Sequence, residues 1–121
     1  MIMAQSVVVL ISRSPYGRED AFAGMRQSLA FLVSGQIDRT VTILIGEGTL
    51  NAVSIQRSEA LGMPSNAAAL SDLVEMEGEV YVIKEDLERL GANLPIVEGV
   101  TTIDWIKARE IISSCQLVNT F

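Results

Sequence analysis

The chain has 121 residues, of which 49% are hydrophobic, and this share excludes intrinsic disorder. A chain of this length fits a single domain over residues 1–121 and encloses a core without disulfides. Its formal net charge of −6 lacks the basic footprint that binding to a phosphate backbone requires. We therefore expect no direct nucleic-acid partner.

The sequence contains no histidine and one cysteine, Cys115. The lack of histidine excludes Ser-His-Asp triads, Cys-His dyads and most zinc sites, and a single cysteine excludes a CxxC redox pair. We expect no metal and no cofactor. The first residues have no basic segment typical of a signal peptide, and no apolar run approaches the ~20 residues that span a bilayer. We therefore predict a cytoplasmic protein with no membrane contact.

Strand and helix patterns alternate along the first half of the chain. β-branched runs at residues 7–11 and 40–45 predict two strands buried on both faces. Between them, an apolar stripe at helical spacing predicts a helix over residues 18–34. Residues 49–53 are expected to form a short helix, and residues 54–65 an irregular segment.

The second half continues this alternation. The elements expected there are a helix over 67–77 capped by Asn66, a strand over 80–83, a helix over 85–90 closed by Gly91, a strand over 94–97, a helix opening at Thr101 with Asp104 in a box-like cap, and a strand over 115–120.

Five strands interleaved with helices predict a three-layer α/β fold with a mainly parallel sheet. In such sheets ligands bind beyond the carboxyl ends of the strands.

The first loop at that edge carries groups that could hold an anion at a helix start: Ser12, Ser14, Gly17 and Arg18. One hypothesis is therefore a flavodoxin-like module that binds a phosphate-bearing small molecule. The alternative is that Ser14 caps the helix and the arginines are solvated or paired, since no glycine-rich phosphate fingerprint is present.

Two further loops at this edge also have two interpretations. Gly46 and Gly48 form a lone GxG, which could face a ligand but is explained equally well by a turn with positive φ. Lys84, Glu85 and Asp86 follow the third predicted strand. They could be an acid–base cluster, although an exposed ion pair is the more usual arrangement at the start of a short helix.

Cys115 lies at the end of the last predicted helix, outside the expected ligand edge. A lone cysteine usually packs as a small hydrophobic residue, whereas a reactive thiolate needs a helix N-terminus or basic neighbours. A persulfide carrier that uses Cys115 is an alternative function.

The apolar content exceeds what one small sheet core readily encloses, with a mean hydropathy of +0.35. Surplus apolar surface usually marks an interface. We therefore predict a homo-oligomer, a dimer, trimer or hexamer, with Val53, Met63 and Ala68 as interface candidates. A charge in place of Val53 is expected to favour the monomer without unfolding it.

Four segments, in order along the chain, resemble the DsrE/DsrF/DsrH-like family, the TusB/TusC/TusD-like sulfur-relay subunits. They are SPYGRE at 14–19, IGEG at 45–48, VYVIKEDLERLG at 80–91 and QLVNTF at 116–121. The resemblance is closest to the DsrF/TusC and DsrH/TusB branches. It implies the fold predicted above and a role in persulfide relay, either for tRNA thiolation or in sulfur oxidation. It also implies assembly with related subunits, with DsrE/TusD-like or TusA-like proteins as partners.

The resemblance also implies where a sulfur-carrying cysteine would stand. In the DsrE and TusD branch it follows the third strand, where this sequence has Ile83 and Lys84; in DsrH-like chains it can lie in the first helix, where this sequence has Ser28. None of these side chains can form a persulfide. The expectation is therefore a noncatalytic subunit or paralogue that scaffolds a sulfur-transfer complex.

Overall fold

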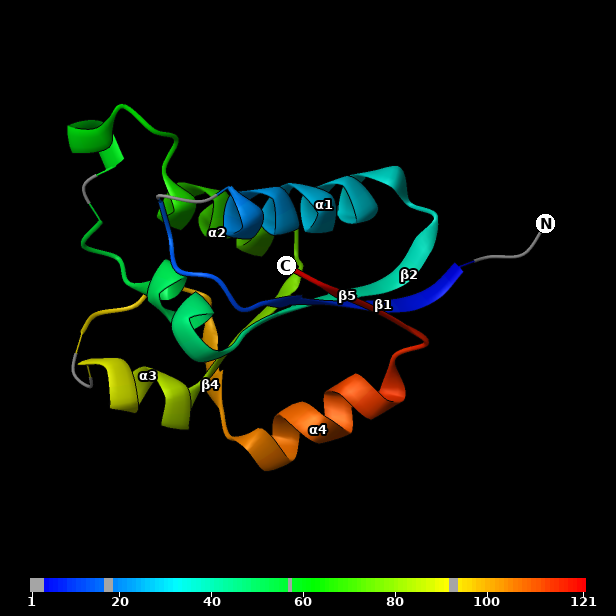
Figure 1. Cartoon of the computed structure of the whole chain (residues 1–121). Coiled ribbons are helices and arrows are strands. Elements are labelled where there is room, and N and C mark those ends of the chain that lie inside the picture. Colours follow the sequence, from blue (N-terminus) through cyan, green and yellow to red (C-terminus); the bar gives the residue numbers. More distant parts are fainter. Residues whose placement is uncertain (1–3, 17–18, 57, 92–93) are drawn as a thin grey trace.

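Five parallel strands form the centre of the molecule (Figure 1). The computed structural model describes residues 4–16, 19–56, 58–91 and 94–121. The strands are β1 Ala4–Ile11, β2 Ile37–Leu44, β3 Glu79–Ile83, β4 Thr101–Ile103 and β5 Leu117–Thr120. They lie in the order β4-β3-β2-β1-β5, and every neighbouring pair is parallel. The expected parallel five-stranded α/β fold is confirmed.

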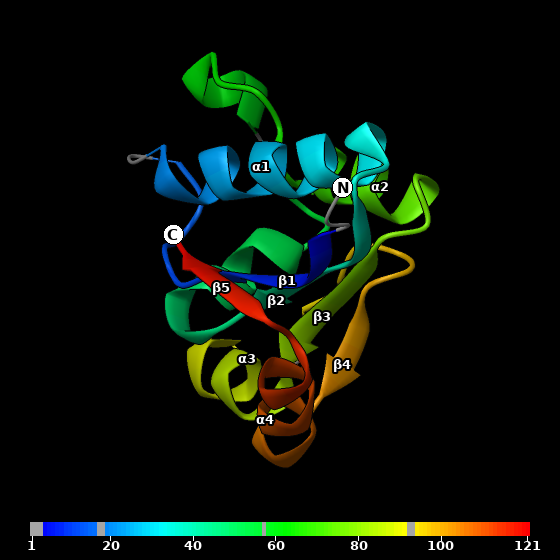
Figure 2. The same ribbon diagram turned by 90° about the vertical axis from the view of Figure 1, so that its right-hand side faces the viewer.

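Helices cover both faces of this sheet (Figures 1 and 2). On one face lie α1 Asp20–Ser34 and α2 Asn66–Glu75, and on the other lie α3 Lys84–Gly91 and α4 Trp105–Ser114. Two short 3-10 helices, η1 Gly46–Ala52 and η2 Ser58–Leu61, lie between β2 and α2. None of the helices in the described ranges has the length and apolar sequence of a membrane-spanning segment.

The β-branched run in β1 explains why the sheet is covered on both sides. Val7, Val8 and Val9 are all 0% exposed. Alternate residues of a strand point to opposite faces, so Val7 and Val9 pack with the α1 and α2 residues, while Val8 packs with Ala108 of α4. A strand buried on both faces is typical of a parallel sheet.

Helix α2 begins one residue earlier than its pattern predicts, and its cap is a different residue. Ser65 is the N-cap: its Oγ accepts a hydrogen bond from the amide of Ala68 at 3.1 Å. Asn66, the expected cap, turns inward and donates from Nδ2 to Oδ1 of Asn51 at 2.7 Å. A serine supplies the cap equally well, which leaves the asparagine amide free for a buried contact.

The expected fourth strand at 94–97 is wrong. Ile96 makes only an isolated antiparallel bridge with Val53, and the fourth strand of the sheet is β4, with the β-branched sequence Thr-Thr-Ile. The last helix accordingly starts later than residue 101. Asp104 is itself the N-cap of α4, because its Oδ1 accepts from the amide of Lys107 at 2.8 Å. A capping carboxylate marks the helix start directly.

The other element boundaries differ from expectation by a few residues. The 3-10 helix η1 starts at Gly46 rather than at residue 49, and the segment expected to be irregular contains η2. Gly91 is the last residue of α3 instead of following the helix. Hydrogen bonding, not composition, sets these ends.

Candidate functional site

The carboxyl ends of the strands lie level with one another. Ile11 pairs with Leu44, and Leu44 pairs in turn with Val82. Ile83 pairs with Ile103 at the end of β4. The loop after β1, the 3-10 helix η1 and the first turns of α3 and α4 therefore meet at one edge, where open α/β sheets bind their ligands.

Asp86 joins three of these segments. The residue is 6% exposed, and its carboxylate accepts hydrogen bonds from the amide of Gly46 at 2.8 Å and from Nε1 of Trp105 at 3.3 Å. Arg89, one turn later in α3, places Nη2 3.6 Å from the same carboxylate. The expectation of an exposed ion pair is wrong for Asp86, because its position in α3 directs the side chain inward beneath η1.

The two residues before Asp86 remain at the surface. Lys84 is exposed and lies 4.0 Å from Glu88, one turn along α3. Glu85 accepts a hydrogen bond from the backbone amide of Trp105 at 3.3 Å. An exposed pair of this kind contributes little to stability, so Lys84 is available to an external group.

The fold needs a glycine at each of the two positions after β2, for different reasons. Gly46 has φ +52, so the expected turn with positive φ is confirmed. A Cβ at Gly48 would lie 1.9 Å from the backbone oxygen of Ile11. Gly48 therefore allows η1 to pack directly on the end of β1.

A buried polar network holds the loops of this edge together. Asn51, which is fully buried, donates from Nδ2 to the carbonyl oxygens of Arg13 and Gly48, both at 2.9 Å. Its Oδ1 accepts from Asn66, as described above. No sequence pattern indicates this pairing, because the two amides are 15 residues apart and separated by the segment expected to be irregular.

Tyr16 and Gln56 extend this network towards the surface. The Tyr16 hydroxyl donates to Oε1 of Gln56 and accepts a hydrogen bond from the amide of Asn66 at 3.4 Å. Gln56 Nε2 donates to the carbonyl oxygens of Asn51 and Val53, both at 2.7 Å. Tyr16 has φ +64, a conformation uncommon for a tyrosine and maintained here by these contacts.

A groove with a volume of about 470 Å³ lies beside this network. It runs between the first turns of α1 and the chain leading into α2. Its lining is mainly apolar and aromatic, with a few polar groups: Tyr16, Glu19, Phe22, Ala23, Arg26, Met63, Pro64 and Asn66. A second hollow of about 370 Å³ continues along α1 past Leu29.

The candidate anion site in the first loop is only partly described. Gly17 and Arg18 lie outside the described residues. Ser12 donates from Oγ to the carbonyl oxygen of Phe121 at 3.0 Å, and its amide donates to the same oxygen. The Ser12 hydroxyl thus secures the end of β5. Ser14 is half-buried, and α1 begins without a side-chain cap.

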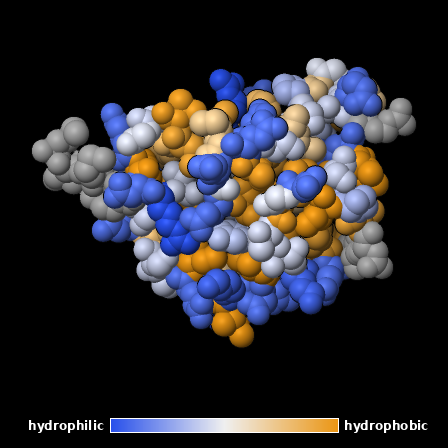
Figure 3. Space-filling view, turned by 180° about the vertical axis from the view of Figure 1, so that it is seen from behind, coloured by the Kyte–Doolittle hydropathy of each residue, from blue (hydrophilic) through white to orange (hydrophobic). Residues whose placement is uncertain are grey.

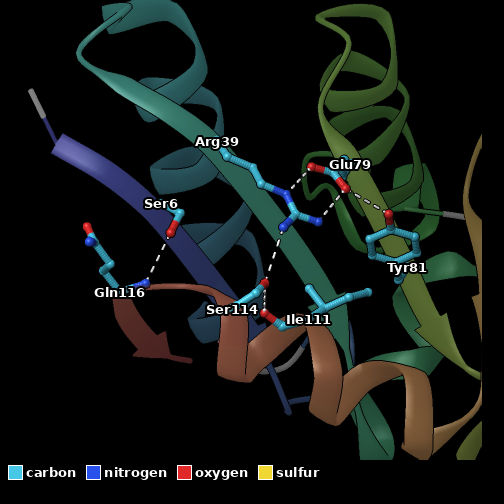
Figure 4. A network of polar contacts seen from close by, with 7 residues as sticks. All are labelled: Ser6, Arg39, Glu79, Tyr81, Ile111, Ser114 and Gln116. Carbon is cyan, nitrogen blue, oxygen red and sulfur yellow. Dashed lines mark hydrogen bonds and ion pairs between the residues drawn. The ribbon is translucent and has the colours of Figure 1, made fainter.

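At the opposite edge of the sheet, Arg39 connects β2, β3 and α4 (Figure 4). Its guanidinium forms a bidentate pair with Glu79, at 2.6 and 2.9 Å, and donates to Oγ of Ser114 at 3.2 Å. The Tyr81 hydroxyl donates to the same carboxylate at 2.8 Å. The hydrogen bond from Arg39 lowers the pKa of Glu79, and burial and then the hydrogen bond to Glu79 raise the pKa of Tyr81.

This carboxylate should make stability depend on acid pH. Because the folded pKa of Glu79 lies below its ordinary value of 4.5, its contribution is present above that value and lost as the pH falls through the folded pKa. We expect Glu79→Gln to lower the free energy of unfolding by about 1 kcal/mol or less at neutral pH, since the group is over a third exposed, and by less than that at about pH 3. Urea unfolding at both pH values measures this. An equal loss at the two values would contradict it.

The two other positions considered for a sulfur-carrying cysteine, Cys115 and Ser28, are both at least partly buried. Cys115 is half-buried beside the residues that pack under α4, and it follows that helix at the amino edge of the sheet. Ser28 is fully buried in α1 and accepts a hydrogen bond from the Thr42 hydroxyl at 2.9 Å. Both are part of the packing of the fold.

The three interface candidates differ in position. Val53 is 8% exposed and bridged to Ile96, so it packs within its own chain. The expectation that a charge there leaves the fold intact is therefore wrong. Met63 is half-buried in the groove and Ala68 is exposed on α2.

These features define an open parallel α/β domain whose ligand edge is built from amides, hydroxyls and carboxylates. Within the described residues, no three His, Cys, Asp or Glu side chains gather to hold a metal ion. The model of the DsrE/DsrF-like family matches residues 5–119, and the chain belongs to this family.

Solved structures agree in fold. The chain is similar to the YchN protein of E. coli, with a TM-score of 0.84 at 21% identity over 97% of this chain and 99% of that chain. It is also similar to BT1422 of Bacteroides thetaiotaomicron, a conserved protein of unknown function, with a TM-score of 0.66 at 12% identity over 95% of this chain and 94% of that chain. None of the curated proteins matches the sequence.

Proposed function

We propose that this chain is a noncatalytic subunit of a sulfur-transfer complex of the DsrE/DsrF type. It holds a persulfide-carrying relative in place and does not carry sulfur itself. The observation that carries the proposal is the identity of the residues at the carboxyl end of β3, where Ile83 and Lys84 occupy the position of the carrier cysteine that the family resemblance implies.

The surroundings of that position also disfavour a persulfide anion. Ile83 is fully buried, so its side chain belongs to the core. Glu85 and Asp86 follow within the first turn of α3, and their negative charge opposes the stabilisation that the helix N-terminus would give a thiolate or persulfide anion. An acidic helix start is therefore consistent with a chain that has no carrier role.

The remaining thiol is far from this edge. The strand registers place Cys115 level with residue 5 and Ile83 level with Ser12. Seven residues of extended chain span about 23 Å. A sulfur atom delivered at the carboxyl edge could not reach Cys115 without leaving the protein.

Association with a carrier tests the proposal directly. The probe is a cysteine-bearing DsrE-like protein from the same genome, mixed with this chain at micromolar concentration and examined by native mass spectrometry. We expect a stable complex that contains both chains. Two species that never associate under these conditions would overturn the proposal.

A persulfide donor provides the second test. We expect the folded wild-type chain to gain no sulfur in intact mass spectrometry, because Cys115 is half-buried and away from any helix N-terminus. The Cys115→Ser variant is the matched control, and the urea-unfolded wild type shows that the donor is active. Sulfur added to folded wild type but absent from Cys115→Ser would mean that the chain is itself a carrier.

A further inference from the structure

The two outer strands of the sheet, β4 and β5, differ in how they are protected, and Figure 2 shows them at opposite sides of the sheet. The outer side of such a strand has unpaired backbone groups, which proteins usually shield with charges, prolines, bulges or a very short strand. β4 has only three residues and is flanked in sequence by Glu98 and Asp104. Figure 3, viewed from the side of β4, shows hydrophilic side chains interspersed among apolar ones. β4 is therefore a protected outer strand.

β5 lacks the same protections. Residues 116–121 include no charged residue and no proline, although the chain as a whole carries a net charge of −6. Leu117 and Val118 are 52% and 48% exposed. Because neighbouring residues of a strand point to opposite faces, neither α1 on one face nor α4 on the other covers this side of the sheet. An exposed, uncharged outer strand is a surface on which another strand can pair.

The hydrogen bonds of Phe121 show which backbone groups of β5 point outward. Its amide donates to the carbonyl oxygen of Leu10 at 2.8 Å, and its own carbonyl oxygen accepts from the amide of Ser12 at 2.7 Å. In a parallel ladder, only every second residue of a strand bonds to a given neighbouring strand. The residues at odd positions of β5 therefore bond to β1, and Val118 and Thr120 direct their N–H and C=O groups away from the sheet.

One antiparallel register with a second copy pairs all of these outward groups. The amide of Gln116 donates to Oγ of Ser6 at 3.1 Å (Figure 4), so outward bonding begins at Val118. A two-fold axis that passes through Asn119 perpendicular to the sheet places Val118 of one copy opposite Thr120 of the other. Such a pair exchanges both N–H···O=C bonds in an antiparallel ladder. Each outward group of one copy then meets a partner in the other.

The side chains match in the same register. Leu117 of one copy lies opposite Phe121 of the other, on the face that α1 covers, and Val118 lies opposite Thr120 on the other face. Cross-strand pairs of aromatic, aliphatic and β-branched residues stabilise a sheet. Two acidic chains repel each other in general, but no charge is brought together along this strand. A second copy thus supplies a strand that complements β5 in hydrogen bonding, side chains and charge.

We propose that two copies of this chain pair through β5, in antiparallel orientation about Asn119, so that their sheets join into one continuous sheet. The contact is the same patch on both copies, so the two-fold axis closes it and leaves no free β5 for a third copy. The pairing goes beyond the proposed function and does not depend on it. It uses the outer side of β5, whereas the position of the carrier cysteine lies at the carboxyl end of β3.

Amide hydrogen exchange, followed by NMR at several protein concentrations, tests the register residue by residue. We expect the amides of Val118 and Thr120 to be protected at high concentration and to lose this protection on dilution. The amide of Asn119 bonds to β1 of its own chain, so it is the internal control and should stay protected throughout. Unprotected amides at Val118 and Thr120 at every concentration would overturn the proposal.

Sedimentation velocity compares a charge on each outer strand. We expect Val118→Lys to raise the dissociation constant of the wild-type dimer at least tenfold, because a lysine on an outer strand opposes pairing. The matched control is Thr102→Lys, at an exposed position of β4, which should leave the dissociation constant unchanged. Circular dichroism shows that both variants are folded. A wild type that does not self-associate, or equal effects of the two lysines, would contradict the pairing.

Disulfide trapping identifies the pairing itself. Opposite residues of a non-hydrogen-bonded antiparallel pair have Cα atoms ~4.5 Å apart, within the range that a disulfide spans. In a Cys115→Ser background, we expect Asn119→Cys to form a covalent homodimer under mild oxidation. Thr102→Cys in the same background is the control and should remain largely monomeric on a denaturing gel. Equal cross-linking of the two variants would overturn the proposed register.

Mixing with the cysteine-bearing relative separates this contact from the proposed function. A β5-paired homodimer that does not bind the relative supports the pairing and removes the scaffold function. A chain that binds the relative but never pairs with itself does the reverse. Protection of the Val118 and Thr120 amides that appears only when the relative is added would assign β5 to the relative and overturn self-pairing.

Discussion

Gly48→Ala is expected to lower the free energy of unfolding by about 4 kcal/mol, a loss large enough to leave much of the protein unfolded at body temperature. The added Cβ would lie 1.9 Å from the carbonyl oxygen of Ile11 and 2.7 Å from its carbonyl carbon. That oxygen already accepts a hydrogen bond from the amide of Ile45 at 3.0 Å, so the end of β1 cannot move without breaking the sheet. Urea unfolding measures the effect.

The neighbouring glycine is the matched control. Gly46 has φ +52, but a Cβ there meets no atom within 4 Å. Gly46→Ala should therefore lower the free energy of unfolding by only ~1 kcal/mol, the cost of holding an alanine in the left-handed backbone conformation. If the two variants were equally stable, direct packing of η1 on β1 would be excluded.

Asp86→Ala is expected to cost about 3 kcal/mol, the second largest loss. Its removal leaves the amide of Gly46 and the indole N–H of Trp105 without their buried acceptor. Trp105 is the one tryptophan of the chain, so its fluorescence reports on this site alone. We expect its emission in the folded variant to shift to longer wavelength, together with a lower urea midpoint.

Glu85→Ala provides the comparison for Asp86. Glu85 is adjacent in the chain and also accepts a hydrogen bond from Trp105, but it is exposed. For Glu85→Ala we expect the free energy of unfolding to change by no more than about 0.5 kcal/mol and the tryptophan fluorescence to stay the same. Equal losses for both variants would show that the carboxylate of Asp86 is not the buried acceptor that joins η1, α3 and α4.

Residue patterns located the edge of the sheet where the candidate site lies, but not the contacts that build it. Strand and helix periodicity placed the loops after β1 and β2 at the carboxyl edge, because in a parallel sheet all strands end on one side. It did not predict that Ser12 faces Phe121 or that Asn51 meets Asn66. The residues of such pairs are far apart in the sequence, so local sequence patterns do not predict them.

The burial of Asp86 could not be predicted from local sequence patterns either. In the sequence it stands beside a lysine and a glutamate at a helix start, which is typical of a solvated surface. Its burial depends on η1 crossing above α3, and that crossing depends on Gly48 packing against β1. Whether a side chain is buried depends on which other segments of the chain pack over it.

The sequence by itself determined the alternation of elements, the parallel sheet and the absence of a thiol after β3. The runs of β-branched residues require burial on both faces, and a single cysteine fixes which positions cannot carry sulfur. Tertiary structure decided that Thr101–Ile103 and not residues 94–97 forms the edge strand, and that Val53 is internal. These outcomes depend on which segments pack together, because the free energy of burying a side chain is set by its neighbours in space.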